Sequence, residues 1–121
     1  MGKRGETAVA DWYRRAGYEL LEANWRCADG EIDLIVESPD RNAYVFCEVK
    51  TRNSKAFGSP LEAVTLAKQR RLRRLAARWL EERRNACSVG EARFHSVRFD
   101  VASVMGLGEG SLTVEVLEAA F

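Results

Sequence analysis

The chain has 121 residues, of which 46% are hydrophobic and 31% are charged, a composition that excludes an intrinsically disordered protein. This length predicts a single domain over residues 1–121,. Nineteen basic residues nearly balance eighteen acidic ones, and the formal net charge is +1. Any nucleic-acid interface must therefore come from where the charges lie and not from their sum.

Cysteine usage and hydropathy bear on the compartment. The three cysteines have no CxxC spacing, which argues against a zinc site and against a disulfide scaffold. Their odd number fits a reducing environment and predicts a cytoplasmic location. The sequence has no apolar run of the ~18 residues that a membrane helix needs, nor the apolar core of a signal peptide, so we expect no membrane partner.

The first predicted element is a helix over residues 3–16, followed by Gly17 as a terminator,. Its apolar side chains share one broad arc when they are placed at about 100° per residue. Glu6 lies inside this arc. Because a buried carboxylate without a partner is costly, an inward-facing Glu6 needs a specific role.

Three strands are predicted next, over residues 18–25, 31–37 and 43–51. In the second, Ile32, Leu34 and Val36 alternate with other residues at a period of two, which is typical of a strand,. The segment 38–42 has the composition of a turn, so the second and third strands should form an antiparallel hairpin,. A turn centred near Asp40 would place Asp33 opposite Glu48.

A long helix over residues 60–84 follows a capping-box pattern at 59–62, with a break near Thr65 as an alternative,. Most of its arginines lie away from its apolar stripe, whereas Lys68 and Gln69 lie at the edge of that stripe, toward the sheet. Strands are then predicted over residues 94–104 and 112–117. The result is an α/β fold with a mixed central β-sheet flanked by helices, in the order α-β-β-β-α-β-β.

Asp33, Glu48 and Lys50 together are typical of metal-dependent phosphodiester hydrolysis. Such chemistry uses a metal to activate water and polarise the phosphoryl oxygen, and Mg²⁺ prefers carboxylates together with water. We predict that Asp33, Glu48 and the main-chain carbonyl of Val49 bind the metal, and that Lys50 stabilises the developing negative charge. Glu6 would add a third acidic ligand or hold a metal-bound water.

Two strings carry a family resemblance: Gly-Glu-Ile-Asp-Leu-Ile at 30–35 and Glu-Val-Lys-Thr-Arg at 48–52 resemble the PD-(D/E)XK nuclease motif. The wider pattern resembles the YraN-like family of uncharacterised bacterial proteins. The other matching pieces are Gly5-Glu6, Gly17-Tyr18, Asn24, Phe57-Gly58, Pro60, Lys68, residues 98–101 and Phe121. One departure is Ile32, which stands where the motif has a proline.

That family is similar in fold to archaeal Holliday-junction resolvases. The resemblance therefore implies a restriction-endonuclease-like fold, Mg²⁺ or Mn²⁺ as the cofactor, a DNA substrate that includes branched DNA, and a homodimer. The site residues that it implies map onto Glu6, Asp33, Glu48 and Lys50. We accordingly predict a metal-dependent endonuclease, with nucleic-acid contacts from Arg52, Lys68, Gln69, Arg70, Arg71 and Arg74.

Two alternatives remain open at this stage. The chain could be a nucleic-acid-binding module without turnover that works with a DNA-processing partner, or a protein-interaction subunit, which the near-neutral net charge allows. The carboxylate and lysine cluster could also be a solvated salt-bridge group, and the arginines a solvated helix face. We expect Asp100 to accept hydrogen bonds from the main chain or from an arginine such as Arg98, and His95 to be packed or exposed.

Overall fold

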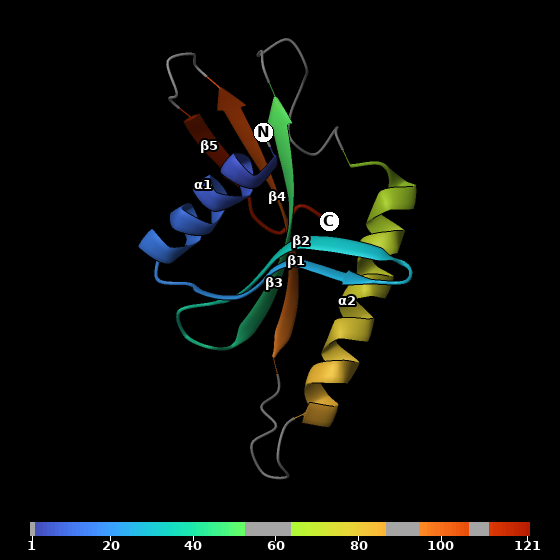
Figure 1. Cartoon of the computed structure of the whole chain (residues 1–121). Coiled ribbons are helices and arrows are strands. Elements are labelled where there is room, and N and C mark those ends of the chain that lie inside the picture. Colours follow the sequence, from blue (N-terminus) through green and yellow to red (C-terminus); the bar gives the residue numbers. More distant parts are fainter. Residues whose placement is uncertain (1, 53–63, 87–94, 107–111) are drawn as a thin grey trace.

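The computed structural model describes residues 2–52, 64–86, 95–106 and 112–121. Its elements, in chain order, are α1 (Gly2–Arg15), β1 (Glu19–Cys27), β2 (Gly30–Glu37), β3 (Ala43–Arg52), α2 (Leu66–Ala86), β4 (Ser96–Gly106) and β5 (Leu112–Leu117). This α/β fold and this order of elements confirm the prediction. The two helices lie on opposite faces of one five-stranded sheet (Figure 1).

The sheet is mixed and has the strand order β1-β2-β3-β4-β5. Its one parallel pair is β3 with β4, and the other neighbours are antiparallel. A parallel pair needs a crossover connection, and α2 lies between β3 and β4 in the chain. In the β2–β3 hairpin Leu34 lies opposite Cys47 and Val36 opposite Val45, which is the register expected from a turn near Asp40.

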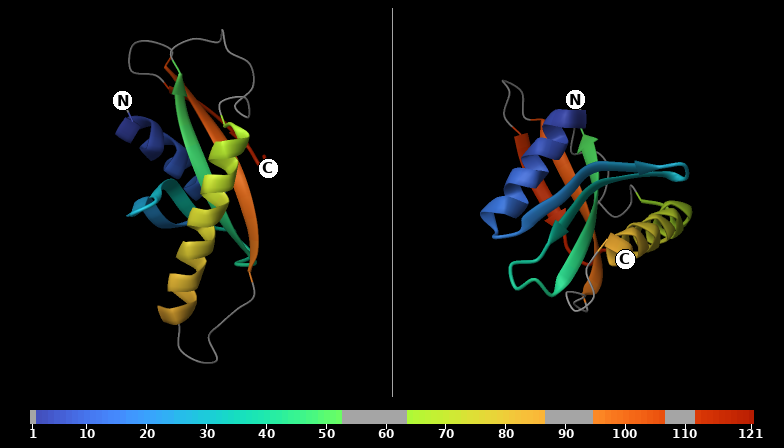
Figure 2. Two further views of the ribbon diagram at one scale, coloured as in Figure 1. Left: turned by 90° about the vertical axis from the view of Figure 1, so that its right-hand side faces the viewer. Right: turned by 60° about the horizontal axis from the view of Figure 1, so that its bottom comes forward.

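Each face of the sheet buries its own apolar cluster against one helix. Val9 and Tyr13 of α1 pack with Val45 of β3 on one face. On the other face, Leu75 and Trp79 of α2 belong to the cluster that includes the β-strand side chains of Ile35, Phe46 and Phe99. The alternation along β3 divides its side chains between the two helices, as its period of two predicts. Figure 2 shows the helices on the two sides of the sheet from two further directions.

The first turn of α1 lies directly on the end of β3. A Cβ atom at Gly5 would come within 2.7 Å of the Thr51 hydroxyl oxygen, and 3.7 Å from a methyl group of Val104. A side chain at this position would force the Thr51 hydroxyl to move, so glycine allows the helix to lie this close to the strand,. It brings the following residue, Glu6, to the C-terminal end of β3, where Lys50 also lies.

The hairpin of β1 and β2 extends beyond the edge of β3. β2 pairs with β1 from Gly30 to Glu37, but its pairing with β3 extends only from Leu34 to Glu37. Two-stranded ribbons twist more strongly than larger sheets. On this ribbon Ile32 packs in the cluster under α2, whereas Leu34 and Val36 pack under α1, so the simple alternation of the strand does not extend to the packing of Ile32.

The long helix begins later than residue 60. The hydroxyl of Thr65 accepts a hydrogen bond from the main-chain N–H of Lys68 at 3.2 Å, which is the geometry of a helix N-cap. The helix therefore begins where the alternative break was expected, and Lys68 becomes its third residue. The capping-box pattern at 59–62 lies outside the described residues.

Two further expectations concern the surroundings of the protein. None of the helices formed by the described residues is long and apolar enough to cross a membrane. Cys27 and Cys47 are free thiols, and Cys87 lies outside the described part of the chain. The cytoplasmic location and the single-domain boundary remain predictions.

Candidate active site

Asp33 lies at the point where β2 leaves β3. Its carboxylate oxygen Oδ2 accepts a hydrogen bond from the main-chain N–H of Val49 at 2.8 Å. In an extended strand the N–H and the C=O of one residue point to the same side, so the Val49 carbonyl points to the same side as its N–H. Beyond Leu34 the main chain of β2 no longer pairs with β3, and the side chain of Asp33 contacts the free edge of β3 instead. This contact lies beside the Val49 carbonyl, which was predicted as a metal ligand.

Glu48 precedes Val49 on β3 and is nearly buried, with 11% of its side chain exposed. Its Oε1 atom lies 3.1 Å from Nζ of Lys68 and 3.7 Å from Nζ of Lys50. Lys50 comes from the same strand, whereas Lys68 comes from the first turn of α2. Two ammonium groups from different elements therefore meet one carboxylate, and a buried charge requires such partners.

Burial and charge in this cluster shift three pKa values, raising those of Asp33 and Lys68 and lowering that of Lys50. Burial and then the charge of Glu48 raise the pKa of Asp33 from its ordinary value of 3.8 to about 6, although the hydrogen bond from Val49 acts in the opposite direction. The neighbouring Lys68 ammonium, burial and the like charge of Lys68 lower the pKa of Lys50. Two like-charged pairs thus share a small, partly desolvated volume, an arrangement that is typical of functional sites.

The donor set fits Mg²⁺ or Mn²⁺. Mg²⁺ commonly uses one or two carboxylates and keeps several waters, and the site offers the carboxylates of Asp33 and Glu48 with the carbonyl of Val49. A divalent cation would also relieve the repulsion that raises the pKa of Asp33,. Within the described ranges no group of three or more His, Cys, Asp or Glu side chains is close enough to hold a metal, which does not suit the closed shell of a structural zinc site.

Glu6 lies near this cluster but is not gathered with Asp33 and Glu48 into a three-carboxylate group among the described residues. It is half-buried on α1. Its negative charge, like that of Glu31, contributes to the raised pKa of Asp33. The structure therefore gives Glu6 an electrostatic link to the site, and both of its predicted roles stay predictions.

The six residues predicted to contact nucleic acid lie on β3 and α2 and differ in their burial and contacts. Lys68 lies against Glu48 inside the site. The amide of Gln69 donates a hydrogen bond to the main-chain carbonyl of Val64 at 3.2 Å, next to the start of the helix. The others are Arg52, half-buried as the last residue of β3, and the three arginines exposed on α2, namely Arg70, Arg71 and Arg74.

The pairing of Lys68 with Glu48 was missed from the sequence. A signal existed, because residues four positions apart share one face of a helix. Leu72, four residues after Lys68, belongs to the buried cluster against the sheet. The sequence therefore indicated that Lys68 lies on the side of α2 that faces the sheet. Which strand residue it contacts depends on how α2 is placed along the sheet.

Two other polar clusters have structural roles. Asp100 is fully buried and accepts hydrogen bonds from the Tyr13 hydroxyl at 2.6 Å, from Arg98 Nε at 2.9 Å and from the Ala119 N–H at 3.0 Å, as expected. His95 Nε2 lies 2.7 Å from a carboxylate oxygen of Glu37, and its ring stacks on the ring of Tyr44. His95 is therefore packed, as one of the two expectations held.

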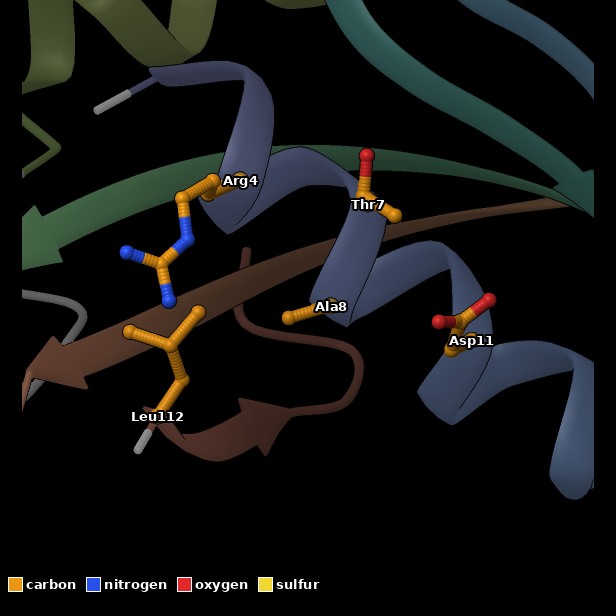
Figure 3. Close-up of a pocket in the computed structure, with 5 residues that line it drawn as sticks. All are labelled: Arg4, Thr7, Ala8, Asp11 and Leu112. Atoms are coloured by element: carbon orange, nitrogen blue, oxygen red, sulfur yellow. The ribbon is translucent and has the colours of Figure 1, made fainter. Parts of the chain in front are cut away.

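One surface pocket lies away from this cluster. It has a volume of about 360 Å³ and is formed between α1 and the first residue of β5 (Figure 3). Its lining side chains are Arg4, Thr7, Ala8, Asp11 and Leu112. None of them is a candidate site residue.

Comparison with known proteins identifies the relatives of this chain. The model of the family described as "Uncharacterised protein family UPF0102" matches residues 5–104. A UPF0102 protein of Beutenbergia cavernae is 47% identical over 117 residues, which cover 97% of this chain and 92% of the relative. Relatives from Frankia casuarinae and Nocardia farcinica are 45% and 40% identical over the whole chain, and the matches cover 95% and 88% of their own lengths. The chain therefore belongs to the UPF0102 family, the YraN-like bacterial family that its motifs resemble.

Proposed function

We propose that this chain is a divalent-metal-dependent endonuclease of the PD-(D/E)XK type that cleaves phosphodiester bonds in DNA, including branched DNA. The observation that carries the proposal is the meeting of two carboxylates and two ammonium groups where β2 leaves β3. Asp33 and Glu48 supply the former, and Lys50 with Lys68 the latter. A cytoplasmic location and a homodimer belong to the same proposal.

The residues of the site have separate tasks in this proposal. Asp33 and Glu48, with the carbonyl of Val49, would hold Mg²⁺ or Mn²⁺, which when bound polarises a phosphoryl oxygen and makes water a better nucleophile. The Lys50 ammonium lies beside these carboxylates and would orient the attacking water and stabilise the charge that grows on the phosphoryl oxygens,. Glu6, near the same end of β3, would hold a second water.

The basic face of α2 supports nucleic acid as the substrate. The helix contains eight basic residues and only two acidic ones, Glu81 and Glu82. Its first turn reaches the site through Lys68, and exposed arginines follow directly along the helix. Because Lys68 points toward the sheet and the arginines are exposed, a phosphate backbone that crosses the first turn of α2 would contact both and reach the site. Such binding is independent of sequence.

The same face also favours one alternative, a nucleic-acid-binding module without turnover. The experiment that separates the two is cleavage of a labelled DNA panel of single-stranded, duplex, flap and four-way-junction molecules, in Mg²⁺, Mn²⁺ or EDTA. Lys50→Ala should lower the cleavage rate by about 10²–10³-fold, the cost of removing one charge-stabilising group. Its circular dichroism spectrum and melting temperature should stay near those of the wild type.

Arg15→Ala is the matched control, because it removes an exposed cation from α1, far from the β2–β3 junction in sequence. It should cut at the wild-type rate. Cleavage that survives in EDTA, or that is equal in Lys50→Ala and the wild type, would refute the proposed enzyme. Salt-sensitive binding of the panel without any cutting would instead support the binding module.

A further inference from the structure

Lys68 and Lys50 contact the same oxygen of Glu48, but they are anchored differently. Lys50 lies two residues after Glu48 on β3, so the strand holds Lys50 beside Glu48 even if the Lys50 ammonium changes its partner. Lys68 reaches the carboxylate from α2 and lies closer, at 3.1 Å against 3.7 Å for Lys50. Its flexible side chain and compact charge allow the ammonium to move without a movement of the helix.

We propose that Lys68 is a built-in counterion that occupies Glu48 in the metal-free protein and leaves it when a divalent cation binds, which couples cation binding to the binding of a phosphodiester. This inference rests on the proposed function, because it concerns the same metal site. It adds a positioning residue on α2 that the motif of β2 and β3 does not contain.

The first step of the argument is competition. A divalent cation bound to Asp33 and Glu48 would lie within a few ångströms of the oxygen that Lys68 now contacts. Two positive charges at such a separation repel strongly in a partly buried site. The cation must therefore displace Lys68 from Glu48, and the cost of this displacement lowers the affinity of the site for metal when no nucleic acid is present.

The second step is the new partner of the displaced ammonium. Lys68 is partly exposed, with 25% of its side chain accessible, and the exposed Arg70, Arg71 and Arg74 follow it on the same helix. A phosphate bound along this basic face would supply an anion to the freed Lys68. A coupling of this kind must be reciprocal, so DNA should raise the affinity for the cation by the same factor that the cation raises the affinity for DNA.

The test is direct titration of the full chain with Mn²⁺, with free Mn²⁺ measured by electron paramagnetic resonance in the absence of DNA. Lys68→Met removes the competing charge and should bind Mn²⁺ about tenfold more tightly than the wild type. Lys68→Arg keeps the charge and should bind Mn²⁺ much as the wild type does. Arg84→Met, which removes an exposed charge from the last turns of the same helix, should change the affinity less than twofold,.

Lys68→Gln serves as a second uncharged variant, because it keeps a hydrogen-bond donor for Glu48 if Lys68→Met fails to fold. Equal or weaker Mn²⁺ binding in both uncharged variants would overturn the inference, and if Asp33→Asn still abolished Mn²⁺ binding, the proposed metal site would stand. An absence of Mn²⁺ binding in the wild type and in every variant would overturn the inference and the proposed metal site together.

Discussion

The carboxylate of Asp33 is held where its own negative charge is disfavoured. One of its oxygens accepts the Val49 N–H, but burial and the neighbouring charge of Glu48 outweigh this hydrogen bond and raise the pKa of Asp33 to about 6. A residue that only stabilised the fold would not require this repulsion. The arrangement is expected where the charge is kept for a ligand, since functional sites commonly reduce stability.

The raised pKa predicts how stability depends on pH. Asp33 titrates near 3.8 in the unfolded chain and near 6 in the folded protein, so between these values the folded state binds more protons. Protonation of Asp33 therefore adds to the free energy of unfolding in full below pH 3.8, and this addition is lost as the pH rises through about 6,. Asp33→Asn has no charge and can still accept the Val49 hydrogen bond, so it should be more stable than the wild type at pH 7–8 by about 1–2 kcal/mol, a value discounted for partial exposure.

Urea denaturation at several pH values between 4 and 8 measures this difference. The stability gained by Asp33→Asn should shrink as the pH falls toward 4. Asp11→Asn provides the control, because Asp11 is an exposed partner of Arg14 on α1, and it should show little difference at any of these values. A gain in Asp33→Asn that is constant across the range would mean that packing, and not the charge, causes it.

At the scale of the element, the beginning of α2 determines which residues reach the site. Thr65 caps the helix by accepting the N–H of Lys68, and this cap fixes Lys68 as the third residue of α2. The same residue therefore has its main chain held by the cap and its ammonium held by Glu48. The residue at which α2 begins therefore also determines which ammonium group reaches Glu48.

Thr65→Ala should remove the cap and lower the free energy of unfolding by about 1 kcal/mol, the usual cost of losing a threonine N-cap. The effect on Lys68 should be visible as well: if the first turn frays, the uncharged variant Lys68→Met should cost less stability in the Thr65→Ala background than in the wild type. Chemical denaturation of the two single variants and the double variant gives this coupling.

Thr113→Ala is a suitable comparison for this cycle, because Thr113 is exposed on the edge strand β5. It should leave the contribution of Lys68 unchanged. If the effects of Thr65→Ala and Lys68→Met on stability simply add, then the cap does not position Lys68, and the contact with Glu48 is determined by the placement of the rest of the helix.

Local sequence patterns were sufficient to predict the β2–β3 hairpin. They were not sufficient to predict how other elements pack against it. The alternation of β2 and β3 and the turn near Asp40 predicted the register of the pair, because both signals are local in sequence,. The packing of Ile32 under α2 did not follow from the alternation, because at this position β2 is paired with β1 and no longer with β3. The contact between Lys68 and Glu48 joins residues on a helix and a strand, and no period in either segment determines it.

At the scale of the whole molecule, the net charge of +1 hides an uneven distribution. Several arginines of α2 are engaged with the fold: Arg78 pairs with Asp29 at 3.3 Å, and the guanidinium of Arg73 lies 4.9 Å from the ring centre of Phe99. The exposed Arg70, Arg71 and Arg74 form no ion pair with a carboxylate of the part of the chain that the structure describes. They follow Lys68 along α2, and in the proposed function they would contact a phosphate backbone,.

Replacing Arg70, Arg71 and Arg74 together with glutamine should weaken DNA binding and make it less sensitive to salt. The slope of log affinity against log salt should become shallower by roughly 0.9 for each arginine that contacts a phosphate. Fluorescence anisotropy of a labelled duplex at several salt concentrations, with EDTA present, measures this slope without cleavage. The control is a triple variant with the same loss of charge at exposed positions outside α2, namely Arg14, Arg15 and Arg41.

The comparison of the two triple variants decides between three interpretations of the helix. If only the α2 variant loses affinity and slope, DNA follows this face, and the site at its first turn lies on the path of the backbone. If both variants lose affinity equally, the protein attracts DNA through its overall field and α2 has no special position. If neither changes, the arginines are a solvated face, and the protein-interaction subunit becomes the better account of the chain.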